Sequence, residues 1–414
     1  MANLSAGCAS SGRPASVTEL AMAAVEIDHY DPLYLANRVA MYRQLHAEGR
    51  PVRHSTKHGG FWFVSGYPEA LEVQRRAEDF SNKERVVPSR PIAPMIPSGL
   101  NPPEHKPVKI ALTKLFLPSA VAELRAKLIR TAHRLFDECT TGRDTFDVVQ
   151  DLMFPLMGEF TMVDMLGLDH ADAARYAAVI HTQSRPVPDV AQAEKMRGAL
   201  AALDAEMRVI LTEKRYDPTS MLAKIATLDV EGRNFSIEEM LHVAFNLITG
   251  GFGTTAVFSG TIFVFLARNP DLRTQIVADP AIIPTAFEEM LRLFTPTQTF
   301  ARRVEHDTEL AGVKMREGEV LLMSYGAANF DPRQFPDPEA VDLRRTPNRH
   351  MGLGTGPHRC LGEAIARLVV CEVLRLMVER IPDYELVEEG VVAQGLSSSM
   401  FGYAHVPIRF GAPG

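Results

Sequence analysis

The fold of this chain is decided by the stretch Leu353-Gly354-Thr355-Gly356-Pro357-His358-Arg359-Cys360-Leu361-Gly362. It places one cysteine in a glycine-rich bend directly ahead of an apolar run, residues 363–378, whose spacing predicts a helix. Glycines carry no side chain, so the backbone can closely approach a large, flat group. A cysteine at a helix N-terminus lies at the positive end of the helix dipole, which favours the thiolate. The bend therefore predicts a thiolate presented to a bound group.

Cys360 has two interpretations, and the residues around it decide between them. On its own, a single cysteine behind a loop is most often an inert side chain, because free cysteine is among the most buried residue types. Here glycines at 354, 356 and 362 surround it, with His358 two residues upstream. A cysteine thiolate is one of the known axial ligands of haem iron. We therefore expect Cys360 to be a metal ligand, bound to the iron of a haem.

The whole chain has the composition of one soluble globular unit. It has 414 residues, of which 46% are hydrophobic and 23% charged, and no linker-like stretch divides it. We expect a loose arm over residues 1–25 and a single domain over residues 26–414. The formal net charge of −7 argues against a nucleic-acid partner.

Cysteine content and apolar runs indicate a cytoplasmic enzyme without membrane attachment. Four cysteines in so long a chain do not form a disulfide framework, and the N-terminus lacks the basic and apolar regions of a signal peptide. The longest apolar run, residues 256–267, is too short to span a bilayer. A reducing cytoplasm is the compartment that these features favour.

Hydrophobic periodicity predicts a mainly α-helical chain with a small β region. Helical spacing runs through residues 32–47, 119–139, 146–166, 191–214, 236–268 and 284–293. Strand patterns are shorter, at residues 60–65, 383–387 and 404–410, and residues 308–323 predict a hairpin that turns at Arg316-Glu317-Gly318. Ser236, with Glu239 three residues on, predicts a capping box at the start of the longest helix.

The longest predicted helix has an unusual centre, Gly250-Gly251-Phe252-Gly253-Thr254-Thr255. Each glycine inside a helix costs roughly 1 kcal/mol relative to alanine, so three of them need a reason. One reason is the close approach of a cofactor, and another is a local opening of the helix that threonine hydroxyls and water fill. A kinked packing helix is the alternative. Next to the cysteine loop, the site interpretation is the stronger one.

Two groups of charged residues need partners inside such a fold. Glu289 and Arg292 lie three apart on one face of an apolar helix, where they can pair, and we assign them a structural role beneath the cysteine loop. An exposed ion pair of this kind contributes little to the stability of the folded protein, but the apolar neighbours of Glu289 and Arg292 indicate that the pair is partly buried. The propionates of a haem need cations, for which the candidates are His105, Lys109, Arg302 and His358.

Together these stretches resemble the bacterial cytochrome P450 family, from about residue 30 to the C-terminus. The cysteine loop matches at Gly354, Gly356, His358, Cys360 and Gly362, with Leu353 in place of the usual phenylalanine. The charged pair matches at Glu289 and Arg292, and the long-helix signature matches at Gly250, Gly251 and Thr254. Asn101-Pro102-Pro103-Glu104-His105 resembles the segment that enters a helix meeting a propionate.

The resemblance implies a triangular, mainly helical fold with haem b between the long helix and the cysteine loop. It implies that Cys360 ligates the iron. It places Gly251, Leu353, Gly354 and Gly362 against the haem and Gly250, Gly253 and Thr254 at the catalytic position. It also implies a monooxygenase that oxidises a small molecule with O₂, using electrons from a ferredoxin and a ferredoxin reductase on separate chains.

The sequence departs from the family pattern at the residue that helps to deliver protons, at a cation that binds a haem propionate, and at a partner of the Glu–Arg pair. Gly253 stands where the family usually has an acid that helps to relay protons to dioxygen. Lys109 stands where the family usually has an arginine that binds a propionate. An arginine guanidinium can bind a carboxylate through two parallel hydrogen bonds, whereas a lysine ammonium is a point charge. Ala340 stands where an arginine often joins the Glu–Arg pair, and Arg344 and Arg345 are the alternatives for that role.

By position in the family pattern, the substrate pocket has mostly apolar walls. These are Phe245, Ile248, Phe252, Thr299, Phe300, Met400 and Phe401. The proline-rich loop 86–99 and the segment 182–193 are the predicted lids, and their cations, Arg90 and Arg185, also suit solvated positions. We expect a mostly apolar substrate such as a terpenoid, a polyketide or an aromatic compound of secondary metabolism.

Two alternatives to ordinary hydroxylation stay open. The missing acid at Gly253 is compatible with a non-standard oxidation, such as oxidative cyclisation, desaturation or a peroxide-driven reaction. The other alternative is a non-catalytic haem sensor, which needs no redox partner. Against the sensor, Arg344, Arg345, Arg349 and Arg359 form a basic cluster near the cysteine that suits an acidic redox partner.

Overall fold

The computed structural model describes residues 26–89, 94–183, 190–394 and 399–411, so the predicted arm over residues 1–25 lies outside it. The α-helices are α1 (Pro32–Ala36), α2 (Arg38–Ala47), α3 (Tyr67–Arg75), α4 (His105–Thr113), α5 (Pro118–Thr140), α6 (Phe154–Glu159), α7 (His170–Gln183), α8 (Val190–Glu213), α9 (Met221–Thr227), α10 (Ile237–Arg268), α11 (Pro270–Ala278), α12 (Ile283–Phe294), α13 (Tyr325–Ala328) and α14 (Glu363–Arg380). Short 3₁₀ or π segments are η1 (Lys57–Gly59), η2 (Lys114–Phe116), η3 (Val148–Met153), η4 (Phe160–Met165), η5 (Pro280–Ile282), η6 (Gly356–His358) and η7 (Glu388–Gly390).

The β region consists of small sheets. The five-stranded sheet has the order β1 (Val52–Ser55), β2 (Phe61–Val64), β8 (Val320–Ser324), β5 (Thr299–Val304) and β3 (Phe80–Ser81). Its strand pairs are antiparallel except β2 with β8, which is parallel. The smaller sheets pair β4 (Thr145–Asp147), β12 (Pro407–Phe410) and β9 (Tyr384–Leu386), then β6 (Thr308–Leu310) with β7 (Val313–Met315), and β10 (Val392–Ala393) with β11 (Tyr403–His405). The predicted mainly α chain with a small β region is confirmed.

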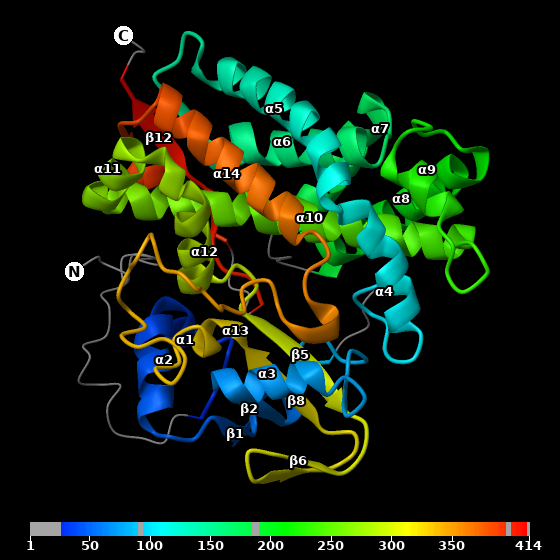
Figure 1. Cartoon of the computed structure of the whole chain (residues 1–414), viewed down its shortest axis with the longest axis vertical. Coiled ribbons are helices and arrows are strands. Elements are labelled where there is room, and N and C mark those ends of the chain that lie inside the picture. Colours follow the sequence, from blue (N-terminus) through cyan, green and yellow to red (C-terminus); the bar gives the residue numbers. More distant parts are fainter. Residues whose placement is uncertain (1–25, 90–93, 184–189, 395–398, 412–414) are drawn as a thin grey trace.

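Most helices lie in one half of the molecule, and the five-stranded sheet lies in the other half together with α1, α2, α3 and α13 (Figure 1). Helices α5, α6, α10 and α14 share one large apolar core, whereas α3 packs against the sheet through a second core. The segment that leads into α14 runs between the two halves (Figure 1). The cysteine loop therefore lies where the helical half meets the sheet half.

The α10 helix is the central element of the helical half. The predicted capping box is confirmed at its start: the Ser236 amide donates to Glu239 Oε2 (2.8 Å) and the Glu239 amide donates to Ser236 Oγ (3.2 Å). The chain stays α-helical through residues 250–255, so the three glycines do not interrupt it. By length and composition α10 could cross a membrane, yet 78% of its most apolar window is buried inside the molecule. Its apolar character is that of a core helix.

Two predicted helices differ from the observed ones at polar residues. The helix predicted over residues 32–47 is divided at Asn37, whose side-chain Nδ2 and backbone N–H both donate to the Leu33 carbonyl and so end α1. The helix predicted over residues 146–166 begins only at Val148. Asp147 ends strand β4 and caps the helix by accepting from the amides of Val149 and Gln150.

The hairpin predicted over residues 308–323 is wrong in its turn. The tight turn lies at Ala311 and Gly312, both with positive φ (49° and 79°), which is the conformation that a two-residue hairpin loop requires. Gly318 also has a positive φ (86°), but its turn leads from β7 into β8, which pairs with β5 and β2 instead of with β7. An alanine in the first turn position hid this turn from pattern reasoning.

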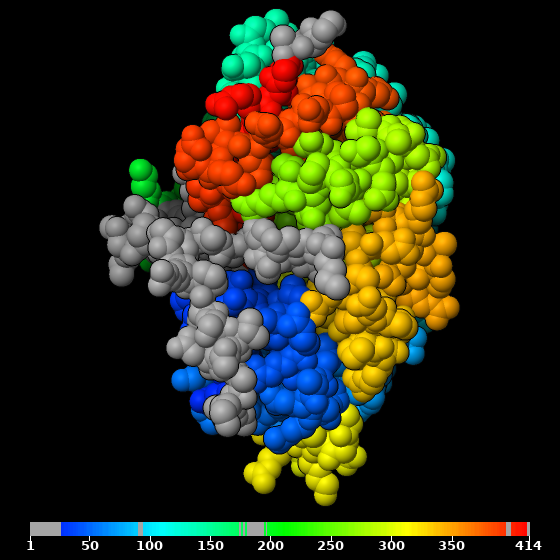
Figure 2. Space-filling model, turned by 90° about the vertical axis from the view of Figure 1, so that its left-hand side faces the viewer, coloured from blue at the N-terminus to red at the C-terminus, as the bar shows by residue number. Residues whose placement is uncertain are grey.

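A side face of the molecule shows how the N-terminal helices join the rest. The blue N-terminal segments lie beside the gold segment near residue 340, below the yellow-green helices α11 and α12 (Figure 2). An ion pair between Arg43 of α2 and Glu339 (2.7 Å) connects the first two of these parts. Tyr42 adds a buried hydrogen bond to Gln298 (2.5 Å), just ahead of β5. The N-terminal helices thus brace the strand that carries Arg302.

Candidate functional site

One backbone hydrogen bond closes the cysteine loop, and another hydrogen bond joins the loop to α3. The Cys360 amide donates to the Leu353 carbonyl (2.8 Å), and the Thr355 amide donates to Gln74 Oε1 (2.7 Å). Gly354 and Gly356 have φ of 67° and 62°, a conformation that side chains rarely adopt. A Cβ on Gly356 would lie 2.7 Å from the Gln74 carbonyl oxygen. This glycine therefore permits contact with α3, in addition to any contact with a cofactor.

The thiol of Cys360 borders open space but is poorly hydrated. Cys360 is exposed and forms no disulfide. The protein around it raises the pKa of the thiol by desolvation, and the Gly362 amide and the Lys109 ammonium lower it by less. The expected lowering of this pKa by the helix N-terminus is thus wrong for the protein alone, because desolvation outweighs the donors. A bound metal ion deprotonates a coordinating thiol outright.

A wall of buried cationic and imidazole groups lies near the loop. Arg302 and His105 are 4% and 3% exposed, and the rings of His105 and His358 stack with centroids 4.0 Å apart. Asn82 Nδ2 donates to the His358 ring (2.8 Å to Nε2). Burial and the neighbouring Lys109 lower the pKa of His105 to about 4, and burial, His105 and Arg302 lower that of His358 to about 2. Among the described residues, no carboxylate is a hydrogen-bond partner of Arg302, His105 or His358.

These residues fit a haem. His105 Nε2 is buried and has no hydrogen-bond partner among the described residues, which is the state of a group that awaits an anion such as a propionate. Added Cβ atoms on Gly250 of α10 and on Gly362 of the loop would meet no atom within 4 Å, so space for a flat group borders both. The exposed thiol, the imidazole pair, the buried Arg302 and the open space together make a suitable site.

Lys109 forms a contact that the sequence did not predict. Its Nζ donates to the Arg359 carbonyl (2.6 Å), which ties α4 to the cysteine loop one residue before Cys360. Burial lowers the pKa of this ammonium, while Cys360 raises it. In the described structure Lys109 therefore supports the loop, and its contact with a propionate stays a prediction.

The residues predicted on α10 lie on several sides of the helix. Gly253 is buried and Thr254 is half-buried. Gly251 lies against Thr161, whose Oγ1 would be 3.6 Å from an added Cβ. Ile248 and Phe252 are buried in the main core, where the Phe252 ring packs on that of Phe154 with centroids 5.2 Å apart. Core packing thus accounts for the position of Phe252.

The other predicted pocket residues come from three segments. Phe245 is partly buried and packs against the main core. Thr299 and Phe300 open strand β5, and the Phe300 ring lies 5.7 Å from that of Tyr325. Met400 bridges to Thr297, and the Phe401 amide donates to the Pro296 carbonyl (2.8 Å). The C-terminal segment therefore runs beside the start of β5.

The predicted lids are described only in part. Residues 90–93 and 184–189, with Arg90 and Arg185, lie outside the described residues. The described end of the first lid is attached to α10: the Ile96 amide donates to the His242 carbonyl (3.4 Å), and Ser98 Oγ donates to Asn246 Oδ1 (2.7 Å).

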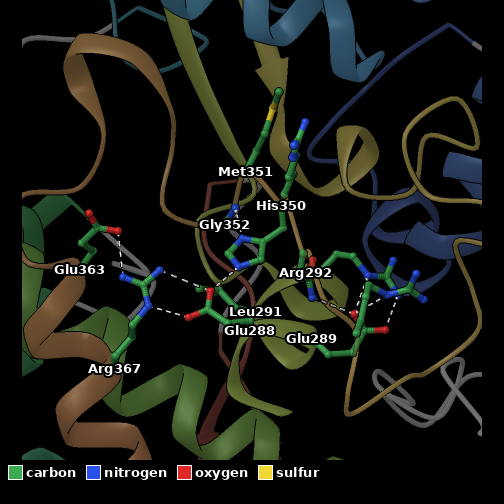
Figure 3. Close-up of polar contacts among 12 residues, drawn as sticks. Glu288, Glu289, Leu291, Arg292, His350, Met351, Gly352, Glu363 and Arg367 are labelled. Carbon is green, nitrogen blue, oxygen red and sulfur yellow. Dashed lines mark hydrogen bonds and ion pairs between the residues drawn. The ribbon is translucent and has the colours of Figure 1, made fainter. Parts of the chain in front are cut away.

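The predicted pair of Glu289 and Arg292 is confirmed as a fully buried ion pair (Figure 3). Two guanidinium nitrogens of Arg292 donate to the two carboxylate oxygens of Glu289 (2.8 and 2.9 Å), and both side chains are 0% exposed. Arg345 Nε also donates to Glu289 (2.9 Å), whereas Arg344 pairs with Asp279 (2.6 Å). Of the two alternatives for the position of the missing arginine, Arg345 is the one that the structure supports.

Beside this pair lies an ion-pair chain that sequence reasoning missed. Glu288 accepts from His350 (2.8 Å) and from Arg367 (2.5 Å), and Arg367 also donates to Glu363 (2.8 Å) (Figure 3). Glu363 in turn accepts from Arg359 (2.6 Å), next to the cysteine. Hydrogen bonds from His350 and Arg367 lower the pKa of Glu288 to about 2, although burial opposes them. No motif distinguishes Glu288 from its neighbour Glu289 in the sequence.

The predicted basic cluster near the cysteine is smaller than expected. Arg345 points into the Glu289 site and is 18% exposed, so it is not part of an outer surface. Arg344 and Arg359 are engaged by Asp279 and Glu363, while Arg349 is exposed. Ion pairing with nearby acids therefore reduces the positive potential that the sequence indicates.

Comparison with known proteins identifies the family. Residues 281–381, which span the Glu–Arg pair and the cysteine loop, match the family model of cytochrome P450. The chain is 31% identical to mycinamicin IV hydroxylase/epoxidase of Micromonospora griseorubida, over 70% of this chain and 74% of that protein. It is 29% identical to a steroid C26-monooxygenase of Mycobacterium tuberculosis, over 94% of this chain and 98% of that protein.

Solved structures give the same result for the fold. CYP108D1 of Novosphingobium aromaticivorans superposes with a TM-score of 0.81 at 26% identity, covering 92% of this chain and 95% of that one. Substrate-free CYP109E1 of Bacillus megaterium superposes with a TM-score of 0.83, and at 24% identity it bears on the fold alone. Sequence and structure agree, and the chain belongs to the cytochrome P450 family of haem-dependent monooxygenases.

Proposed function

We propose that Cys360 is the axial ligand of the haem and that His105, His358 and Arg302 hold its propionates. The observation that carries this assignment is the exposed Cys360 thiol in a closed loop, near the stacked rings of His105 and His358 and the buried Arg302. The Gly362 amide donates toward the sulfur, which stabilises its thiolate. Lys109 and the ion-pair chain from Arg359 to His350 keep the loop in place.

The reaction is a monooxygenation of a C–H bond. Haem, when bound, supplies the oxidising chemistry: substrate R–H, O₂, two electrons and two protons give R–OH and water. The protein positions the substrate, excludes bulk water and delivers the protons. Thr254 is the hydroxyl of α10 at the position that handles a proton, and Gly253 offers no carboxyl group beside it. Ordered water therefore carries the proton that an acid at residue 253 would otherwise supply.

The substrate in this proposal is a mostly apolar small molecule such as a terpenoid, a polyketide or an aromatic compound. The relatives named above include a mycinamicin IV hydroxylase/epoxidase and a steroid C26-monooxygenase, and their names support a small-molecule substrate for this chain. Ile248, Phe300 and Phe401 are the side chains of this chain that we assign to apolar walls. A role in secondary metabolism follows from the same substrate classes.

The electrons in this proposal come from a ferredoxin and its reductase on separate chains, in the cytoplasm. Arg349 and Arg359 are exposed near the cysteine loop, where an acidic partner would come close to the haem. Within the described residues Cys139, Cys360 and Cys371 form no disulfide, which suits a reducing compartment.

The proposed function is tested by reconstitution with ¹⁸O₂. The purified protein, loaded with haem, is expected to give the thiolate-type ferrous–CO spectrum and, with a ferredoxin and reductase, a product that carries one ¹⁸O atom. Cys360→Ser removes the thiolate spectrum, while the control Cys371→Ser, at a buried cysteine outside the loop, keeps it. A thiolate spectrum that survives Cys360→Ser would overturn the ligand assignment.

Gly253 carries a second candidate, a non-standard oxidation. A buried glycine at the position of the acid lowers the capacity for proton delivery to dioxygen, and a peroxide-driven reaction needs less of this delivery because peroxide already carries two electrons and two protons. Oxidative cyclisation and desaturation are the other reactions of this candidate. A product without ¹⁸O from O₂, or product formation with peroxide alone, would favour this candidate.

A further inference from the structure

The Glu288 side chain lies between two segments that lead to the two ends of the cysteine loop (Figure 3). Its Oε2 accepts from His350 Nε2 (2.8 Å), and its Oε1 accepts from Arg367 Nε (2.5 Å). Arg367 Nη2 also donates to Oε2 (3.3 Å), so the guanidinium binds both carboxylate oxygens. The neighbouring Glu289 is occupied in its separate ion pair with Arg292. Glu288 is therefore the carboxylate of α12 that serves the cysteine loop.

His350 connects Glu288 to the N-terminal end of the loop. Its Nδ1 accepts from the Gly352 amide (3.1 Å). A backbone amide can only donate, so Nδ1 is the acceptor and Nε2 carries the proton that faces Glu288. The imidazole is 4% exposed, so both hydrogen bonds are shielded from bulk water. The orientation of the ring is thus fixed from two sides, by a carboxylate and by the backbone of residue 352.

Gly352 joins this attachment to the hydrogen bond that closes the loop. A Cβ on Gly352 would lie 2.7 Å from Leu291 Cγ and 2.9 Å from the Leu291 carbonyl oxygen, so the backbone lies directly against α12. The carbonyl of the next residue, Leu353, accepts from the Cys360 amide (2.8 Å). The Glu288 carboxylate is therefore linked to the cysteine amide through one imidazole and two backbone residues.

Arg367 connects Glu288 to the C-terminal end of the loop. Its Nη1 donates to Glu363 Oε2 (2.8 Å), and the same oxygen accepts from Arg359 Nη2 (2.6 Å). Arg359 is the residue before Cys360. Carboxylates and guanidiniums alternate along this arm, so each charge has an opposite charge beside it. One carboxylate on α12 thus holds both ends of the loop.

The links of the second arm differ in strength, and the link at Glu288 is the strongest. Arg359 is 55% exposed, so water and salt weaken its pair with Glu363. Glu288 is 23% exposed and binds Arg367 through two hydrogen bonds. Although burial opposes the change, hydrogen bonds from His350 and Arg367 lower the pKa of Glu288 to about 2. The carboxylate is therefore ionised throughout the neutral pH range.

We propose that Glu288 is a positioning residue that holds both ends of the cysteine loop and so keeps the Cys360 sulfur bound to the haem iron as a thiolate. The proposal rests on the proposed function, which makes Cys360 the ligand, and it adds the group that keeps this ligand in place. Loss of the carboxylate leaves the His350 donor unpaired and the Arg367 charge unbalanced, so both ends of the loop gain freedom at once. The sulfur then leaves the iron more readily.

The test measures how fast the haem-loaded protein loses its thiolate-type ferrous–CO spectrum at one fixed temperature. Glu288→Gln keeps the size of the side chain and removes its charge. Hydrogen bonds to charged groups predict that this variant loses the spectrum about tenfold faster than the wild type. Bound haem, measured as the pyridine haemochrome, and helix content, measured by circular dichroism, are expected to stay unchanged during this loss.

Glu372→Gln is the matched control. Glu372 is 11% exposed and, like Glu288, accepts from more than one guanidinium nitrogen, here from Arg125 and Arg375 (2.6 Å each). These partners belong to α5 and α14 and lie outside the cysteine loop. The control is expected to lower the urea concentration at which the protein unfolds, yet to leave the rate of spectral loss within about twofold of the wild-type rate.

Variants of the two arms test whether the arms act through Glu288. His350→Asn keeps an acceptor for the Gly352 amide but loses the donor to Glu288. Arg367→Lys keeps a charge but loses the fork of two hydrogen bonds. Each variant is expected to speed the spectral loss on its own, and to add less than about twofold when it is combined with Glu288→Gln.

Several results would overturn the proposal. These are a wild-type rate of spectral loss in Glu288→Gln, equal acceleration in Glu288→Gln and Glu372→Gln, arm variants whose effects multiply with that of Glu288→Gln, and a spectral loss that occurs only together with loss of haem or helix content. Glu288→Asp, which keeps the charge on a shorter side chain, gives the same comparison with Glu372→Asp if Glu288→Gln does not fold. Failure of the proposed function is seen separately in the wild-type protein, as a missing thiolate-type CO spectrum or a product without ¹⁸O.

Discussion

Arg345 donates from Nε to Oε2 of Glu289 over 2.9 Å, across 56 residues of sequence. Arg292 Nε donates to the same oxygen, also over 2.9 Å, so one buried carboxylate binds two guanidinium groups. Arg345 Nη2 further donates to the carbonyl of Ala340 (3.3 Å), the residue that stands where the family often has an arginine. The charge missing at residue 340 is therefore supplied from five residues further along.

Replacement of Arg345 is expected to destabilise the protein more than replacement of its neighbour. Arg345→Ala leaves part of a fully buried carboxylate without a partner, which costs about 2–4 kcal/mol of the free energy of unfolding. Arg344→Ala breaks an exposed pair with Asp279 and costs less than about 1 kcal/mol. Urea unfolding of both variants measures the difference, and equal losses would contradict the role given to Arg345.

His29 is expected to make the protein less stable in acid. Its side chain is 1% exposed, both ring nitrogens lack a hydrogen-bond partner among the described residues, and burial lowers its pKa from 6.5 to about 4. The unfolded chain therefore binds a proton below pH 6.5 that the folded protein does not accept until about pH 4. This contribution to stability is complete above pH 6.5, falls as the pH decreases and levels off below about pH 4, a loss of roughly 3 kcal/mol.

The variant His29→Phe tests this origin of acid sensitivity. Phenylalanine keeps a ring that packs next to Phe61 and cannot be protonated, so the loss between pH 6.5 and 4 is expected to shrink by the same amount. His306→Phe is the control, because His306 is 57% exposed, pairs with Asp79 and is not among the groups that shift the pKa of His29. An unchanged pH profile in His29→Phe would assign the acid sensitivity to other groups.

Gly253→Asp is expected to change the coupling of electrons to product more than it changes substrate affinity. The new carboxyl group supplies the acid that the family usually has at this position, and a positioned acid accelerates proton transfer by about a hundredfold or more. Peroxide release per electron pair, the product profile and the substrate Kd are measured together. Gly253→Ala adds a methyl group without an acid and controls for the buried position. Faster formation of one unchanged hydroxylated product would count against a non-standard oxidation.

Arg359→Glu is expected to slow reduction by ferredoxin by about tenfold at low salt, with an unchanged substrate Kd. The variant reverses an exposed charge next to Cys360 and places it against Glu363. Arg380→Glu, at the other end of α14 in a pair with Asp137, is the charge-matched control. Stopped-flow reduction at several salt concentrations checks the prediction. Equal rates in the two variants would locate the docking face elsewhere.

Local signals in the sequence predicted much of this fold. The capping box at Ser236, the long apolar helix and the Glu289–Arg292 spacing depend on neighbours within a few residues, and all three are confirmed. The division at Asn37 and the turn at Ala311 also depend on local contacts, but these residue types permit other conformations as well. Pattern reasoning cannot choose among such conformations.

Features that depend on contacts between distant segments of the chain could not be predicted from the sequence. The choice of Arg345 over Arg344 depends on which side chain reaches Glu289, and the pKa of Cys360 depends on desolvation by several segments at once. Residue types and spacing were enough to predict the chemistry of the cysteine loop, whereas the arrangement of Arg302, His105 and His358 near it could be seen only in the tertiary structure.

The uninterrupted course of α10 limits how this enzyme can evolve. Its 32 residues extend over roughly 48 Å, and the proposed catalytic residue Thr254 lies near the middle of the helix, just before a segment that is buried from Thr255 to Leu266. One inserted residue near Gly250 would turn everything that follows by about 100° and advance it by about 1.5 Å. Ile262 and Phe263, which are 0% and 1% exposed, would then lose their present packing partners, among them the Tyr384 ring 5.8 Å from that of Phe263. New reactivity in this helix must therefore arise by replacement of residues, and insertions and deletions are confined to the loops.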